Sequence, residues 1–323
     1  MSLTAPPTVR DETPTLRGIA VAPPRVLKFQ RIAMVFITTL PLLGLAAGIW
    51  YWWGRGVSAV DVGLLVGFYI ATGLGITVGY HRMLTHQSFK APVPVRVTWA
   101  VLGSLAIQGA AIDWVATHRR HHAYTDVPGD PHSPHVDAGD GFVGILKGLW
   151  YAHVGWMFAP DQTVAEVWAP DLLKDRHIAR VSKLFPWIIL ASFLLPGILG
   201  GLLTMSFTGA ITGMLWGGLI RMMLLHHVTW SINSICHVFG TKPFNAHDES
   251  RNNPIMALLA FGEGWHNAHH AFPASARHGL RWWEFDASWL VIRGMSLVNL
   301  ARDVKLPTPA QMQRRRNAGA AGG

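Results

Sequence analysis

The chain contains little cysteine and few charged residues for its length. Cys236 is its one cysteine among 323 residues, which excludes an intrachain disulfide and a metal site built from several thiolates. Charged residues make up 14% of the chain, against roughly a quarter in average soluble domains. Because 50% of the residues are hydrophobic, the composition favours a membrane protein over a large soluble domain. Histidine is abundant instead, with 17 residues, so nitrogen and oxygen must supply any metal ligands.

Acidic side chains are also scarce, with 18 Asp and Glu against 27 Lys and Arg, which gives a formal net charge of +9. The basic residues are spread around apolar segments. This pattern favours an anionic membrane leaflet, or an acidic redox protein, over nucleic acid as the partner. We expect no secretory signal peptide at the start. The proline-rich residues 1–27 and the basic tail 309–323 are expected to be disordered, which leaves 28–308 as one domain.

Four segments are long and apolar enough to cross a bilayer as helices, which takes about 20 residues. Two more apolar stretches, 97–112 and 142–158, are shorter, and we expect helices that lie in the interface or pack on the protein. Arg221 interrupts the last long segment, where a charge is either a candidate for function or one that snorkels to the membrane surface or pairs inside the protein. The expected spans are about 32–53, 59–80, 184–203 and 208–232.

Basic residues set the expected orientation. Lys28 and Arg31 precede the first span, and the segment after the second span and the C-terminal tail are also rich in Lys and Arg. The positive-inside rule therefore predicts that both termini and the long 81–183 segment lie in the cytoplasm. The expected fold class is an all-α, multi-pass integral membrane protein with four transmembrane helices.

Nine of the histidines fall into short motifs. HxxHH occurs at 118–122 and at 266–270, and positions i, i+3 and i+4 of an α-helix share one face, so each motif can aim three imidazoles at one point. Asn233 and His237 are four residues apart and also share a face. The nine histidines are His81, His86, His118, His121, His122, His237, His266, His269 and His270.

His81 and His86 are five apart, about 140° around an α-helix, so either they serve different metals or the helix ends between them. Nine imidazoles are too many for one metal, whereas two adjacent metals with four or five each would use them all. Imidazole suits Fe, Zn, Cu and Ni alike. Nine ligands can converge only on one side of a membrane, which four spans allow and a spanning 97–112 stretch would prevent.

The other eight histidines are expected to be ordinary hydrogen-bonded surface or core residues, because a lone histidine usually is. His226 and His227 are the least certain, since they lie on the helix that leads to His237. The eight are His132, His135, His153, His177, His226, His227, His247 and His278.

Around these motifs, from about Tyr80 to Pro307, the sequence resembles the membrane fatty acid desaturases of the stearoyl-CoA type, and among them the bacterial members. The family implies a four-helix membrane stem capped by a cytoplasmic helical domain, with two Fe²⁺ ions between them. Carried over position by position, the nine histidines hold the irons and Asn233 reaches one iron through water. The resemblance rests on GYHRMLTHQSF (79–89), DWVATHRRHHAYTD (113–126), DPHSP (130–134), TWSINSICH (229–237) and GEGWHNAHHAFP (262–273).

The family also implies a narrow, bent tunnel for the acyl chain that passes the irons. Core packing is the alternative for the two tryptophans that match its lining. The matching residues are Gln108, Trp114, Thr229 and Trp230. Acidic residues near the motifs are candidates to hydrogen-bond the ligand imidazoles, with a surface carboxylate or helix cap as the alternative. These are Asp113, Asp126, Asp130 and Glu263.

The acyl carrier stays open between CoA and a membrane lipid. In animal members of the family, an arginine and an aspartate before the first HxxHH motif help to hold CoA. The matching positions in this sequence are Ala116 and Thr117. The sequence of residues 275–293 is similar to that of bacterial members, some of which act on acyl groups in lipids.

The expected activity is an O2-dependent desaturase that inserts a cis double bond, at Δ9 by resemblance, into a saturated acyl chain. Alkyl C–H bonds have no acidity to exploit, whereas non-haem iron with O2 can remove hydrogen atoms. The electrons must come from a ferredoxin, a rubredoxin or cytochrome b5 with its reductase, since no haem or iron–sulfur motif is present. The alternatives are a di-iron hydroxylase of alkyl or lipid chains and, in another class, a non-catalytic membrane metal-binding or transport protein.

Overall fold

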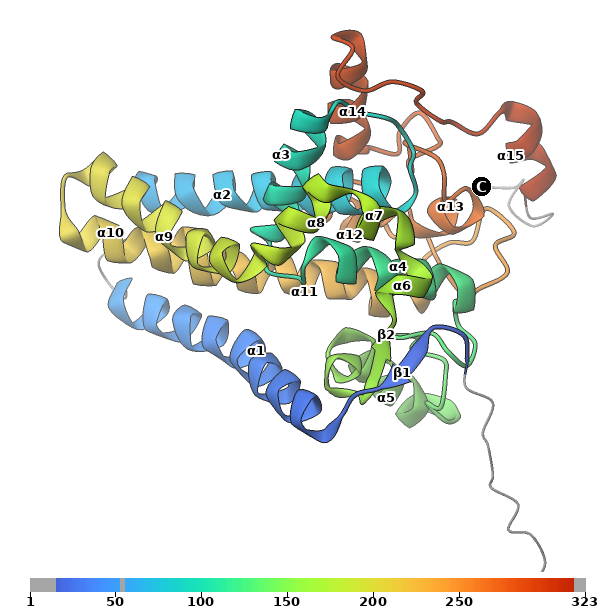
Figure 1. The fold of residues 1–323 in the computed structure, drawn as a ribbon, viewed down its shortest axis with the longest axis horizontal. Coiled ribbons are helices and arrows are strands. Elements are labelled where there is room, and N and C mark those ends of the chain that lie inside the picture. The colour runs from blue at the N-terminus through green and yellow to red at the C-terminus, as the bar shows by residue number, and fades with distance from the viewer. Residues whose placement is uncertain (1–15, 53–55, 317–323) are drawn as a thin grey trace, which may run out of the picture.

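Long apolar helices form one end of the molecule, and shorter helices and loops form the other (Figure 1). The computed structural model describes residues 16–52 and 56–316. Four helical stretches are long and apolar enough to cross a membrane, and they overlap the four expected spans. The fold is therefore the expected all-α one with four candidate membrane helices. The four stretches are Pro24–Tyr51, Ala59–Thr85, Phe185–Thr204 and Phe207–His237.

These four stretches form a stem, and two of them contain wider, π-helical turns. Glycines let the stem helices approach closely, as where Gly200 in the third stretch faces the backbone of Gly209 in the fourth. The elements of the stem are α1 (Pro24–Trp52), α2 (Ala59–Leu74), the π-helix η1 (Gly75–Thr85), α9 (Phe185–Thr204), α10 (Phe207–Gly213), the π-helix η3 (Met214–Ile220), α11 (Arg221–Ser234) and the 3-10 turn η4 (Ile235–His237).

Arg221 is fully buried in the stem and paired internally. Its Nε donates to the Gly217 carbonyl at 3.1 Å, and its two terminal nitrogens donate to the Leu105 carbonyl at 3.2 Å and to Ser192 Oγ at 2.6 Å. The charge of Arg221 is therefore paired inside the protein, as one of the expected alternatives had it. Arg221 thereby ties α11 to α9 and to the loop that follows the first helix of the cap.

The rest of the chain forms a cap at one end of the stem. The two short apolar stretches are here the helices α3, which packs on η1, and α5, which buries Gly144 and Gly148 and exposes Phe142 and Trp150. The elements of the cap are α3 (Val93–Ser104), α4 (Ala111–Tyr124), α5 (Gly141–His153), the 3-10 turn η2 (Gly155–Phe158), α6 (Ala165–Trp168), α7 (Pro170–Lys174), α8 (Arg176–Lys183), α12 (Pro254–Leu259), α13 (His266–Ala271), α14 (Ala287–Leu297) and α15 (Pro309–Arg315).

The expectation of disorder at both ends is wrong for the residues that the structure describes. Strand β1 (Ile19–Val21) pairs antiparallel with β2 (Asp161–Thr163), and α1 already begins at Pro24. In the tail, Thr308 caps α15. The partner of β1 lies some 140 residues away, so local composition gives no sign of it. Residues 1–15 and 317–323, which the same expectation covers, lie outside the described part of the chain.

Candidate metal centre

Nine imidazoles from four distant motifs converge in two neighbouring groups where the stem meets the cap. Within each group the candidate ligand atoms all lie within 4.8 Å of one another. The first group consists of His81, His86, His118, His122 and His269, and the second of His121, His237, His266 and His270. Each motif histidine therefore belongs to one group, which is the division into four and five that two adjacent metals require.

The end of the π-helix η1 brings His81 and His86 together. The backbone N–H of His86 donates to the His81 carbonyl at 3.1 Å, which is the i to i+5 bond of a π-helix. This wider turn leaves the two ring centroids 4.8 Å apart, and both rings fall in the first group. The helix ends at Thr85, between the two histidines, which is one of the two alternatives that their spacing allowed.

The two HxxHH motifs do not aim three rings at one point, as was expected, but divide between the groups. His118 and His122 of α4 join the first group, whereas His121 joins the second. On α13 the i and i+4 histidines also stay together, and the i+3 histidine, His269, joins the other group. Around an α-helix, position i+4 lies about 40° to one side of position i and position i+3 about 60° to the other. One short helix can therefore serve two adjacent sites.

Four carboxylates lie behind the imidazoles and fix their tautomers. An Nδ1–H that donates to a carboxylate leaves Nε2 with a bare lone pair, which is the form that binds a metal. The Nδ1 contacts are His81 with Glu263 at 2.6 Å, His121 with Asp130 at 2.9 Å, His237 with Asp126 at 2.9 Å and His270 with Asp248 at 2.8 Å.

The donor set fits a pair of metal ions. Nε2 of His121 and of His270 is buried and has no hydrogen-bond partner among the described residues, although Nδ1 of each ring already donates to a carboxylate. Two buried lone pairs of one group thus lack a donor, which is costly unless a cation is present. In the same group Nε2 of His237 lies 3.0 Å from that of His266. Two nitrogens about 2.1 Å from one metal and at right angles are also about 3 Å apart.

Burial and the carboxylates set the charges of the centre. Burial, and then the neighbouring imidazoles, hold the pKa of His118, His122 and His269 well below its usual value, so these rings are neutral at pH 7. Burial acts to raise the pKa of Asp126 and Asp130, but the hydrogen bonds and charge of the adjacent histidines outweigh it and lower the pKa of both. Neutral imidazoles backed by ionised carboxylates favour a bound cation.

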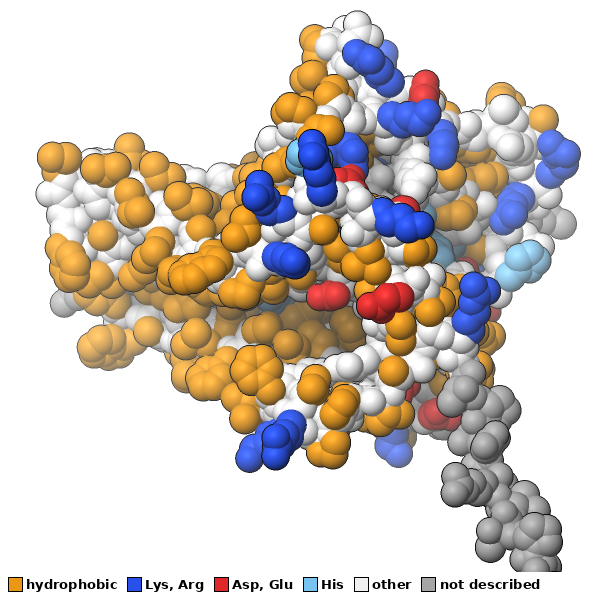
Figure 2. All heavy atoms as spheres, viewed as in Figure 1, with side chains coloured by type: hydrophobic (Ala, Val, Ile, Leu, Met, Phe, Trp, Pro, Cys, Tyr) orange, Lys and Arg blue, Asp and Glu red, His pale blue; other side chains and the backbone are white. Residues whose placement is uncertain are grey.

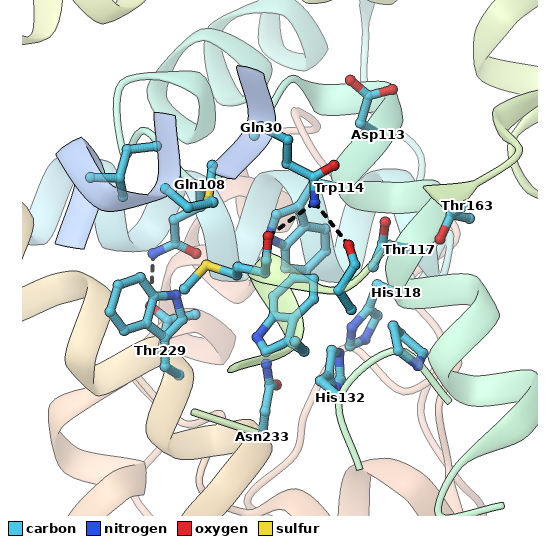
Figure 3. Close-up of a pocket in the computed structure, with 18 of the residues that line it drawn as sticks. Gln30, Gln108, Asp113, Trp114, Thr117, His118, His132, Thr163, Thr229 and Asn233 are labelled. Carbon is cyan, nitrogen blue, oxygen red and sulfur yellow. Dashed lines mark hydrogen bonds between the residues drawn. The ribbon is translucent and has the colours of Figure 1, made fainter. Parts of the chain in front are cut away.

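Three of the four acidic residues expected beside the imidazoles are there. Asp113 is not, because it is exposed and lines a cavity, and Figure 3 shows its carboxylate pointing away from His118. Sequence reasoning missed Asp248, which lies in a loop without any metal-ligand spacing. It also missed the role of His278, whose Nδ1 lies 3.3 Å from a carboxylate oxygen of Glu263 and helps to hold it.

A cavity of about 570 Å³ leads to the centre and is lined by all four residues expected for the tunnel. Gln108 Nε2 donates to Thr229 Oγ1 at 2.8 Å (Figure 3). Trp114 stacks on His118, with ring centroids 5.0 Å apart, so it forms a wall directly beside the first group. The remaining member of the set is Trp230.

Asn233 is outside both imidazole groups but close to them. It lines the large cavity and also a smaller one of about 50 Å³, which reaches His81 and His266. His81 belongs to the first group and His266 to the second, so Asn233 lies where the cavities meet the centre.

Comparisons with known proteins agree with this geometry. The family model described as "Fatty acid desaturase" matches residues 58–297. The chain is 42% identical to the hex-5-enoyl-[acyl-carrier protein] acetylenase of Moorena producens, over 86% of this chain and 87% of that protein. It is 38% identical to the sn-1 stearoyl-lipid 9-desaturase of Anabaena variabilis, over 85% and 96%. It is 39% identical to the palmitoyl-monogalactosyldiacylglycerol delta-7 desaturase of Arabidopsis thaliana, over 90% and 72%. The chain therefore belongs to the fatty acid desaturase family, and it is a membrane oxidoreductase.

Proposed function

We propose that this protein is an O2-dependent desaturase that inserts a cis double bond, at Δ9, into a saturated acyl chain carried by a lipid or by CoA. The observation that carries the proposal is the pair of imidazole groups, which adjoins a largely apolar cavity of about 570 Å³. The Δ9 position is supported by relatives whose names include stearoyl-lipid 9-desaturases.

The nine histidines are proposed to hold two Fe²⁺ ions, with Asn233 reaching one of them through water. When bound, the iron pair supplies the O2 chemistry that takes one hydrogen atom from each of two neighbouring carbons. The protein holds the ligand rings with Asp126, Asp130 and Glu263, and the cavity keeps water from the chain. Gln108 and Trp114 lie on its wall, and the depth of the cavity sets how far the chain enters and hence which two carbons react.

The electrons for the reaction are proposed to come from a separate protein, a ferredoxin, a rubredoxin or cytochrome b5 with its reductase. With a single cysteine, the chain cannot build an iron–sulfur cluster held by cysteine thiolates. Lys and Arg exceed Asp and Glu, so the surface can attract an acidic donor protein. The cap and both termini are proposed to lie in the cytoplasm, where such donors are reduced.

Fatty acid profiling in a bacterial host that lacks its own desaturase tests the proposal. We expect wild-type protein to produce monounsaturated chains that are two hydrogens lighter than their precursors, and mass spectrometry locates the double bond. His269→Ala should abolish the product and lower the bound iron, because His269 belongs to the first imidazole group. His247→Ala is the matched control, since His247 is exposed and outside both groups.

The products separate the proposed activity from its competitors. A product that gains oxygen would indicate a hydroxylase, and an alkyne formed from an enoyl chain would indicate an acetylenase like the Moorena producens relative. Full activity of His269→Ala would contradict the ligand assignment. Metal flux into vesicles without any change in the acyl chains would favour the non-catalytic alternative.

A further inference from the structure

Helix α1 contacts η3 and α11 of the stem and η2 of the cap, and Figure 1 shows it diverging from the other stem helices toward its N-terminal end. Near its C-terminal end, Gly44 packs against Leu219 of η3. Near its N-terminal end, Gln30 Nε2 donates to the Met157 carbonyl of η2 at 2.9 Å. The large cavity occupies the space between these two contacts, so α1 forms one of its side walls.

On α1, two basic side chains at the expected level of the lipid headgroups precede the apolar residues that line the cavity. Lys28 and Arg31 are exposed near the start of the helix, where charged side chains meet the lipid headgroups. Met34 and Ile37 follow Arg31 by one and two turns and line the cavity, at depths up to about 9 Å on the apolar side. The cavity therefore extends to the depth of the lipid chains.

The opposite wall repeats this arrangement. Arg180 and Lys183 are exposed at the end of α8, immediately before α9 enters the apolar zone. Phe185 and Ile189, at the start of α9, line the cavity. Figure 2 shows an apolar hollow in this region, with acidic side chains at its upper edge and basic side chains farther out, above and below it.

We propose that the acyl chain enters sideways from the bilayer between α1 and α9 while still attached to an anionic membrane glycerolipid. This inference rests on the proposed function and names its substrate class. The basic residues at the two rims attract the headgroup, and the apolar walls take the acyl chain past Trp114 to the imidazole groups. A lipid has its chain at this depth already, whereas a soluble carrier would have to deliver it there.

The charges inside the cavity also disfavour a soluble CoA thioester. The charged lining residues there are Asp113, Asp161 and Arg120. Arg120 is buried and engaged, since its Nε donates to the Gly129 carbonyl at 2.8 Å and its guanidinium lies 3.7 Å from Asp161. Two carboxylates against one paired guanidinium leave little attraction for the pyrophosphate of CoA.

A photo-crosslinking experiment tests the entry route without relying on catalysis. The purified protein is placed in phosphatidylcholine vesicles with a trace of phosphatidylglycerol whose stearoyl chain carries a terminal diazirine, and crosslinked peptides are mapped by mass spectrometry. We expect labelling of the cavity wall at α9 and around Trp114. Ile37→Trp, which fills the opening, should remove this labelling. Val35→Trp should keep it, because Val35 is 52% exposed and not part of the cavity lining.

A second pair of substitutions tests the headgroup contact. Lys28→Gln and Lys183→Gln should each lower labelling of the cavity by anionic phosphatidylglycerol about fivefold, the electrostatic effect of one basic residue at a membrane surface. Labelling of the lipid-facing side of α1 should not change and serves as the internal control. Cavity labelling by a diazirine stearoyl-CoA, but not by the phospholipid, would overturn the inference.

An activity comparison separates this inference from the proposed function. Iron-loaded protein with a reducing system receives deuterated stearoyl chains either in phosphatidylglycerol or as stearoyl-CoA, in vesicles without acyltransferases. We expect desaturated product only in the lipid arm. Product only in the CoA arm would overturn the entry route and keep the desaturase. Lipid crosslinks in the cavity with no product in either arm would support the route and contradict the proposed reaction.

Discussion

At the scale of single residues, the centre depends on carboxylates that do not line the large cavity. Asp126 is one of them, and it accepts hydrogen bonds from His237 Nδ1 and the Glu249 backbone on one oxygen and from Ser133 on the other. Its backbone has φ of 60°, in the left-handed region that Asp and Asn tolerate best. Asp126 thus links the loop after α4 to the end of the fourth stem stretch.

We expect Asp126→Asn to weaken metal binding about 10- to 100-fold, the usual cost of removing an outer partner of a ligand histidine. Asparagine keeps the volume and the left-handed backbone but removes the negative charge behind His237. The bound iron per protein, measured after dialysis against a graded chelator, reports the change. Asp113→Asn is the control and should leave iron binding unaltered. Equal iron retention in both variants would show that the Asp126 charge is unimportant.

The convergence of the nine histidines could be predicted from sequence because their spacings are local, whereas the carboxylates behind them could be predicted only in part. Asp126 and Asp130 closely follow the HxxHH motif of α4. Asp130 contacts His121 of that motif, and Asp126 contacts His237. Asp113 is five residues before His118, about 140° around α4, so it faces another way. Asp248 reaches His270 only through the folding of a loop, which no spacing records.

At the scale of elements, close contacts between backbones position the histidines of the stem. A Cβ on Gly75 would collide with the backbone of Leu102 and Gly103 in α3. Gly103 in turn faces the ring of Tyr80, whose hydroxyl lies 2.6 Å from Ser104 Oγ. The α3–η1 contact therefore holds the turn that carries His81.

Gly75→Ala should lower stability by about 1–3 kcal/mol, because the added methyl group meets backbone that cannot give way. The control is Gly67→Ala on the same membrane stretch, where a Cβ would meet nothing within 4 Å and alanine favours the helix. Thermal unfolding in detergent measures both. A Tm for Gly75→Ala equal to that of Gly67→Ala would contradict the close contact.

Hydropathy located the four membrane stretches but not their internal winding. The apolar segments that continue from α2 into η1 and from α10 into η3 read as uniform helices, yet each contains π-helical turns. For η1 the wider turn explains how a five-residue spacing serves one group. Strand β1 could not be predicted either, because its three residues gain strand geometry only from β2.

At the scale of the whole molecule, all nine imidazoles lie at one end of the stem, so the orientation of the stem decides which compartment they face. The turn between α9 and α10 lies at the opposite end (Figure 1). Phe207, beside that turn, is 82% exposed, and Trp282 in the cap is 93% exposed. These two positions report on opposite faces of the membrane.

Cysteine labelling with an impermeant maleimide tests the orientation. Phe207→Cys should react in intact cells, whereas Trp282→Cys should react only after lysis. The natural Cys236 is fully buried and provides a low background. The reverse pattern would place the cap outside the cytoplasm and exclude a cytoplasmic electron donor.

The division of the ligands between two groups also bears on how the protein is made. Translation proceeds from the N-terminus, so His81 and His86 emerge long before the last motif. Neither group is complete until His269 and His270 have left the ribosome, by which point all four stem stretches have been synthesised. Under the proposed ligand assignment, iron capture is consequently a late maturation step, and a chain truncated before residue 269 would lack a histidine of each group while keeping every helix of its anchor.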